Sequence, residues 1–199
     1  MSLFFFNTNG FSMKKKKLPQ KIVRQKKGKQ KPSRKGIDAF VKKLAESASL
    51  EVADKFFKKY GHNYVNAKDS VGNPILSLSI YYGHEPLALY LIDKGADIQA
   101  TDENGNTPLI YAASGHNDRL TRHLVNQGAD VNARNINGIT ALDMAIHGGL
   151  ADIVSFLISQ GADVGTKDNF GKKALDKARE KLKIYSNIVK MIERKSRRW

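Results

Sequence analysis

GADIQATDENGNTPL, residues Gly95–Leu109, contains glycines and carboxylates of the kind found in phosphate-binding and metal-binding loops. Similar stretches, however, recur along the chain. Glycines stand 33 residues apart at positions 72, 105, 138 and 171, and a second series stands at 95, 128 and 161. A leucine follows each glycine of the first series by four residues. Self-similarity at a fixed period is the signature of a repeat protein. The stretch is therefore interpreted as a repeated framework and not as a unique chemical site.

Each unit is predicted to contain two short helices and a turn. In GNTPLIYAASGH (Gly105–His116), Thr107 can cap a helix through its hydroxyl, and Pro108 suits the first helical position, where a missing N–H costs nothing. Leu109 begins an apolar stripe at helical spacing. After a chain reversal, a second helix is expected to end at Gly128 in the left-handed conformation. The Asn-, Asp- and Gly-rich residues that follow predict a turn or hairpin finger.

These residues closely resemble the ankyrin repeat family. The family pattern reads G-x-T-P-L-H-x-A-A-x-x-G-H, then an apolar second helix, then G-A-D-V-N-A, and it is matched by GNTPLIYAASGH…LTRHLVNQGADVNA and by GITALDMAIHGG…IVSFLISQGADVGT. The resemblance implies an all-α, helix-turn-helix solenoid with short turn or hairpin fingers.

The resemblance also divides the chain into units. Clear repeats are expected at residues 69–101, 102–134 and 135–167. A degenerate N-terminal capping repeat is expected at 37–68, and a degenerate C-terminal capping repeat with a two-residue insertion at 168–199. The terminal units of a solenoid need polar outer faces, and the lysines of both end segments suit that role.

The chain departs from the family pattern in two respects. The histidine of T-P-L-H is replaced by Ser77, Ile110, Asp143 and Asp176. The hydrogen bonds that this histidine usually makes between units are therefore expected to be absent or altered. Gly115 and His116 also come one residue early relative to Gly83 and the histidine after it. We accordingly expect the inter-helix turn of that unit to be reshaped.

Composition excludes several classes of protein. The chain has 199 residues, 41% of them hydrophobic, which suffices for one domain, and it has no apolar run of the roughly 18 to 20 residues that cross a bilayer. Without cysteine it can form neither a disulfide nor a thiolate zinc site. The apolar residues at the start precede the lysines, the reverse of a secretory signal. A soluble, intracellular protein is expected.

Basic residues are concentrated at the two ends. Residues 1–36 hold 12 Lys and Arg and no acid, whereas residues 37–171 hold 11 basic and 16 acidic residues. With few apolar residues and two prolines, this basic N-terminal arm is expected to be disordered. It is interpreted as a solubilising extension, a nuclear-import-like signal, or an electrostatic contact to nucleic acid or an anionic membrane. Translation could begin at Met1 or at Met13. The tail residues expected to act electrostatically are Lys14, Lys15, Lys16, Lys17, Arg24, Lys26 and Lys27.

No catalytic or metal-binding motif stands out from the repeat. The five histidines are spread over different units without a tight pair, so a structural role is expected and no metal site. In GTKDNFGKK (Gly165–Lys173), five residues separate the glycines where a phosphate loop needs four, and no hydroxyl residue follows the lysine. The aspartates recur at fixed places, as turn and capping residues do. Neither an enzyme activity, a cofactor nor a small-molecule substrate is expected.

The resemblance implies a concave surface made by the fingers and the exposed face of the first helices. Tyr81, Tyr82, Ile136 and Phe170 are apolar or aromatic where solvent should lie, so they are the expected anchors. The chain is accordingly interpreted as a non-catalytic, monomeric adaptor for a protein partner. The alternative is a nucleic-acid or anionic-membrane binder driven by the tail. The full set of expected contact residues is Val71, Asn73, Tyr81, Tyr82, Glu103, Asn104, Asn106, Ile136, Ile139, His147, Phe170 and Lys172.

Overall fold

The computed structural model describes residues 31–183, so the predicted electrostatic tail residues, all within 14–27, and the end of the C-terminal capping repeat lie outside the described residues. The helices are α1 (Arg34–Ser47), α2 (Leu50–Tyr60), η1 (His62–Asn66), α3 (Ile75–Tyr81), α4 (Glu85–Asp93), α5 (Pro108–Ser114), α6 (Asp118–Asn126), α7 (Ala141–Gly148) and α8 (Ala151–Ser159). Residues 174–183 are helical as well. Across residues 31–183 no strand forms, which confirms the all-α class.

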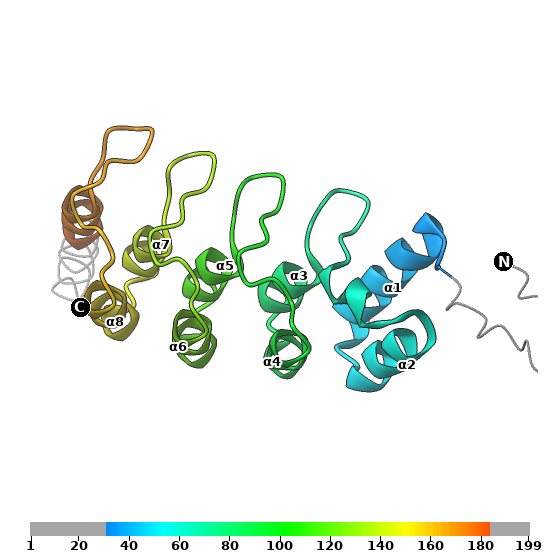
Figure 1. Ribbon diagram of the computed structural model, residues 1–199. Helices are drawn as coiled ribbons and strands as arrows, with labels where there is room; N and C mark the ends of the chain where they lie inside the picture. The colour runs from blue at the N-terminus through cyan, green and yellow to red at the C-terminus, as the bar shows by residue number, and fades with distance from the viewer. Residues whose placement is uncertain (1–30, 184–199) are drawn as a thin grey trace, which may run out of the picture. The chain divides into compact units, whose positions relative to one another are not determined.

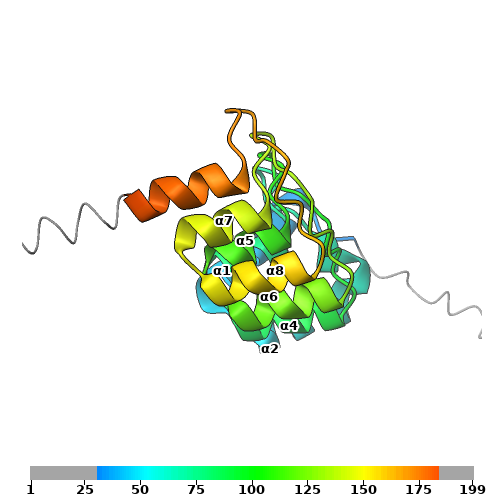
Figure 2. The same ribbon diagram turned by 90° about the vertical axis from the view of Figure 1, so that its left-hand side faces the viewer.

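The helices stand in two rows (Figure 1). The first helices α1, α3, α5 and α7 follow one another in one row, and the second helices α2, α4, α6 and α8 follow in the other. Helix α5 contacts α3, α7 and its own partner α6. The loops between units all project from one side of the rows, and they overlap when the rows are viewed end-on (Figure 2). This arrangement confirms the helix-turn-helix solenoid.

Helix starts follow the local sequence. The Thr107 hydroxyl accepts a hydrogen bond from the Ile110 N–H at 3.3 Å, and Pro108 is the first residue of α5. In the next unit, the Thr140 hydroxyl accepts from the Asp143 N–H while the Asp143 carboxylate accepts from the Thr140 N–H, which forms a capping box. Each cap satisfies backbone donors that an isolated helix start would leave unpaired.

The core is a ladder of repeated apolar residues. Leu76, Leu109 and Leu142 come from successive first helices and are each at most 2% exposed. The second helices contribute their own ladder of fully buried leucines, Leu91, Leu124 and Leu157. A fully buried leucine contributes roughly 1.5 to 3 kcal/mol to folding. Because these side chains are covered partly by neighbouring units, a single unit could not bury them alone.

In the three clear repeats, the turn between the two helices keeps its left-handed residue at one position. Gly83, His116 and Gly149, each 33 residues apart, have φ values of 74°, 58° and 71°. Gly115 has an ordinary φ of −84°. The expectation of a reshaped turn at Gly115 is therefore wrong. The repeat fixes which position is left-handed, and His116 occupies it although histidine lacks the conformational freedom of glycine.

Four finger tips, at residues 69–73, 102–106, 135–139 and 168–172, project from the loops. In each tip, the oxygen of the first side chain accepts backbone N–H groups two and four residues later, at 2.7 to 3.0 Å. Neighbouring fingers are also joined, since the Ile136 N–H donates to the Asn104 carbonyl at 3.0 Å. The predicted fingers are thus tight turns, and backbone hydrogen bonds join the second tip to the third and the third to the fourth. The first residues of the four tips are Asp69, Asp102, Asn135 and Asp168.

The N-terminal unit is built around aromatic rings. Phe40 from α1 stacks on Phe56 from α2 with ring centroids 3.6 Å apart, and Phe57 meets Phe40 edge-on at 5.7 Å. The Ser33 hydroxyl accepts a hydrogen bond from the Gly36 N–H and caps α1. Helix α1 therefore begins inside the segment 1–36 that the sequence assigns to the tail.

Candidate protein-binding surface

Apolar side chains stand exposed at the finger tips. Val71, Ile136 and Phe170 are 55%, 61% and 70% exposed, and each belongs to a different finger. The backbone of each tip is occupied internally by its leading Asp or Asn, so these side chains project from a fixed turn. Two further predicted contact residues, Glu103 and Asn104, are exposed on the tip of the remaining finger.

A tyrosine cluster lies where α3 meets α5. Tyr81 and Tyr82 at the end of α3 are 67% and 53% exposed. The Tyr81 ring meets Tyr82 and Tyr111 edge-on, with centroids 5.2 and 5.9 Å apart. The Tyr111 hydroxyl donates to Asp102 Oδ2 at 2.6 Å, which ties the cluster to a finger. Two of the predicted anchors are therefore neighbours, held by a third tyrosine that the sequence did not single out.

Burial and hydrogen bonding set the protonation states of Tyr111 and Asp102 at neutral pH. Burial and the hydrogen bond to Asp102 raise the pKa of Tyr111 to about 12. Burial alone would raise the pKa of Asp102, but hydrogen bonds from Tyr111 and Asn106 outweigh it and lower that pKa. Tyr111 is therefore neutral beside an ionised Asp102 carboxylate.

Two predicted contact residues are engaged inside the fingers. The Asn73 amide donates to Asp69 Oδ2 at 2.9 Å, and the Asn106 amide donates to Asp102 Oδ2 at 3.0 Å. Asn106 Oδ1 also accepts from the Asn135 amide at 2.8 Å. Both asparagines are half-buried, and a partner would meet them only in competition with these bonds. Their role in binding stays a prediction.

A groove of about 730 Å³ lies beside α7 and residues 174–183. The structure brings four predicted contact residues, distant in sequence, to its lining: Ile139, His147, Phe170 and Lys172. Lys172 Nζ also forms an ion pair with Glu180 at 2.8 Å. The sequence did not single out Met144 or Lys177, which line the same groove.

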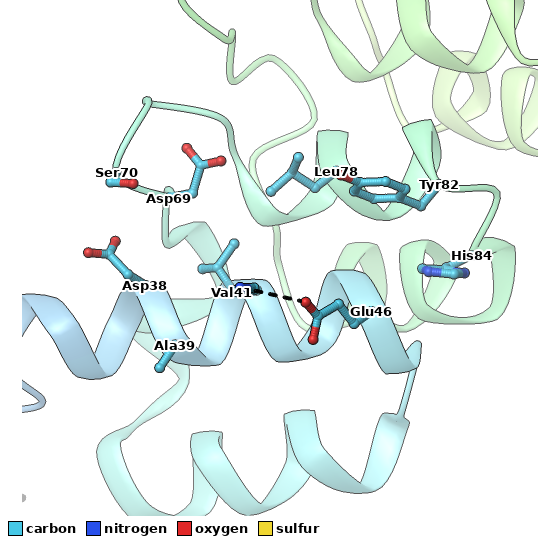
Figure 3. A pocket seen from close by; sticks show the side chains of 10 residues that line it. Asp38, Ala39, Val41, Glu46, Asp69, Ser70, Leu78, Tyr82 and His84 are labelled. Atoms are coloured by element: carbon cyan, nitrogen blue, oxygen red, sulfur yellow. Dashed lines mark ion pairs between the residues drawn. The ribbon is translucent and has the colours of Figure 1, made fainter.

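A second groove, of about 660 Å³, lies between α1 and α3 and is called here the N-terminal groove (Figure 3). The predicted anchor Tyr82 lines it, but the side chains that α1 contributes were missed. The degenerate first unit lacks the family pattern, so no repeat register indicated which α1 residues face α3. The groove is lined by Asp38, Ala39, Val41, Lys42, Glu46, Asp69, Ser70, Leu78, Tyr82 and His84.

The recurrent aspartates serve as turn residues, as their spacing predicts. The side chains of Asp69, Asp102 and Asp168 all accept backbone N–H groups of their own fingers. Within residues 31–183, His, Cys, Asp and Glu form no group of three that could hold a metal ion. Over the same residues, no helix is both long enough and apolar enough to span a membrane.

Comparison with known proteins agrees with the geometry. The ankyrin repeat pattern matches three overlapping stretches, residues 33–135, 76–168 and 115–193. The chain belongs to the ankyrin repeat family, whose repeats are generally protein–protein interaction modules and typically not enzymes. An ankyrin repeat protein of fowlpox virus (strain NVSL) is 33% identical over 67 residues. That segment covers 34% of this chain and 35% of the viral protein, so the match spans about a third of the relative's length.

Proposed function

We propose that this protein is a non-catalytic adaptor that binds a protein partner through its finger tips and first helices. The observation that carries the proposal is the exposure of four large side chains at the end of α3 and on the finger tips: Tyr81, Tyr82, Ile136 and Phe170. Each is more than half exposed, although a monomer gains nothing by leaving large apolar side chains in water.

The rigidity of the fingers supports affinity. Ordering a loop on contact has an entropic cost that weakens binding. These tips avoid that cost because internal hydrogen bonds already hold them. Tyrosine is a favourable anchor, since it offers a large contact area with few rotatable bonds. A good anchor contributes about 2 kcal/mol or more to binding.

The test compares two sets of alanine substitutions. Peptides selected from a random display library against the full chain are measured again on a variant with alanine at all four anchors. We expect their affinity to fall about 100-fold or more. Leu50→Ala with Ile158→Ala is the matched control, since these side chains are 42% and 47% exposed but lie on second helices. Equal affinity of both variants, with unchanged thermal unfolding, would refute the proposal.

The second candidate function is electrostatic binding of nucleic acid or an anionic membrane by the tail, supported by 12 basic residues without an acid in residues 1–36. A variant lacking residues 1–30 keeps Ser33, the cap of α1. Binding to duplex DNA and to phosphatidylserine vesicles, measured at low and high salt, distinguishes the functions. If the protein is an adaptor, the variant still binds the selected peptides. If the tail drives binding, the variant loses nearly all affinity for DNA or vesicles.

A further inference from the structure

The N-terminal groove has a charge opposite to that of the chain. Asp38, Glu46 and Asp69 bring three carboxylates to it, and Lys42 brings one ammonium, while the whole chain carries a net charge of +15. Lys42 Nζ lies 3.9 Å from Glu46 Oε1, with 78% and 65% of the two side chains exposed. Exposed pairs of this kind contribute little, so a better-placed cation can displace the lysine.

The groove also has an apolar middle. Leu78 from α3 lines it as a partly buried side chain at the edge of the hydrophobic core, and Val41 from α1, which is only 1% exposed, closes the floor beneath. In Figure 3, Asp38 and Asp69 lie toward one end of these side chains, and Glu46, Tyr82 and His84 lie toward the other. Acceptors for a cation therefore flank an apolar patch on both sides.

The two ends offer different contacts. Burial would raise the pKa of Asp69, but hydrogen bonds from the side chain of Asn73 and from the N–H groups of Asn73, Val71 and Gly72 lower it, so this carboxylate is ionised. At the other end, Tyr82 is 53% exposed, its ring stacks on His84 with centroids 6.1 Å apart, and an exposed aromatic face beside a carboxylate attracts a guanidinium. Arginine suits both ends because its planar fork pairs with carboxylates and stacks on aromatic rings.

We propose that the N-terminal groove binds a segment of a partner protein in which an apolar side chain is flanked by arginines. The apolar side chain packs on Leu78, above the buried Val41. One arginine pairs with Asp38 and Asp69, and the other lies over Tyr82 next to Glu46. This inference rests on the proposed adaptor function and specifies the chemistry of the partner at one part of the surface.

The probes are fluorescent ten-residue peptides with one leucine between two arginines, at spacings of one to three residues. Parallel sets replace both arginines by glutamate or the leucine by serine. Fluorescence anisotropy with the full chain should show binding by at least one arginine spacing and by none of the glutamate peptides. The serine peptide of the same spacing should bind about tenfold more weakly.

Paired variants separate the groove from general electrostatics. Asp38→Asn with Glu46→Gln should weaken binding about tenfold. Asp93→Asn with Asp152→Asn changes the net charge equally on the exposed parts of α4 and α8 and should leave affinity unchanged. Lys42→Ala removes the competing cation and should tighten binding about two- to threefold, a gain that a folding defect cannot imitate.

Three outcomes would overturn the inference. In the first, no arginine peptide binds while peptides from the display library still do. The adaptor function would then hold, but the N-terminal groove would not recognise arginine-flanked segments. Another is an equal effect of both charge variants. The third is stronger binding by a peptide of residues 14–30 than by any panel member, which would make the chain's own basic segment the occupant.

Discussion

Lys177 Nζ lies 2.8 Å from Asp143 Oδ1, and this ion pair joins the helical residues 174–183 to the repeat before them. Asp143 stands where the family pattern has histidine, so the expected alteration of inter-unit contacts takes the form of an ion pair at this position. Asp168 completes the contact, with Oδ2 at 2.9 Å from the same Nζ. The three side chains are only 17%, 11% and 4% exposed.

Removal of this cation should loosen the C-terminal end of the solenoid. Lys177→Met leaves two largely buried carboxylates without their counter-charge, and we expect the free energy of unfolding to fall by about 3 kcal/mol. Urea titration measures the loss, and hydrogen exchange should quicken in residues 168–183 more than in residues 102–134. Lys172→Met is the control, since its exposed pair with Glu180 should change stability by less than about 0.5 kcal/mol. Equal losses in the two variants would contradict the assigned role.

His116→Gly should stabilise the protein. A non-glycine residue in the left-handed region costs about 1 kcal/mol or more, and glycine removes that cost at φ 58°. Gly83→Ala is the reverse change at the equivalent position, where an added Cβ would meet no atom within 4 Å. It should destabilise by a similar amount through the backbone alone. Thermal unfolding measures both shifts, and shifts of the same sign would show that the turns are not equivalent.

The Asp102 carboxylate should contribute pH-dependent stability. Its pKa lies below the ordinary value of 3.8 in the folded protein, so its contribution is fully present above about pH 4 and is lost as the pH falls through the folded-state pKa. Asp102→Asn should cost about 1 to 2 kcal/mol at pH 7 and progressively less at pH 3 and below, as measured by urea titration. The neutral side chain of Asn135 holds the equivalent turn, so the finger should persist in this variant.

Tyr111→Phe provides a second measurement of the same contact. It removes the hydroxyl that donates to Asp102 and should reduce part of the pH dependence without removing the charge. An unchanged pH profile in both variants would exclude Asp102 as its source.

Side-chain amides couple neighbouring units on the side of the fingers. Asn132 Oδ1 accepts from the Asp163 N–H at 2.8 Å, and its amide donates to the Gly161 carbonyl at 3.0 Å. Asn132→Ala should therefore cost about 1 kcal/mol per lost bond and expose residues 161–163 to faster hydrogen exchange. Asn126→Ala, at an exposed position of α6, is the control. Indistinguishable exchange in the two variants would mean that these amides do not couple the units.

Much of the fold was predictable because it is encoded by local rules that repeat. The cap at Thr107, the apolar ladder through Leu109 and the terminating glycine at 128 each depend on neighbouring residues only. The candidate surface was predictable in part for the same reason, since the repeat register places Ile136 and Phe170 on finger tips. The N-terminal groove was not predictable, because α1 follows no repeat register that would align Asp38 and Glu46 with α3.

The sequence by itself determined the repeating unit, its helix starts and stops, and the all-α class, because a 33-residue period of capping and turn residues restricts each unit to one local conformation. Only the tertiary structure decided what touches across units: the pairing of Lys177 with Asp143 and the grooves beside α1 and α7. The physical reason is that a side chain's partner in a stack lies about one repeat away along the chain. Which partner the side chain contacts depends on how the helices pack, and no local sequence pattern specifies that packing.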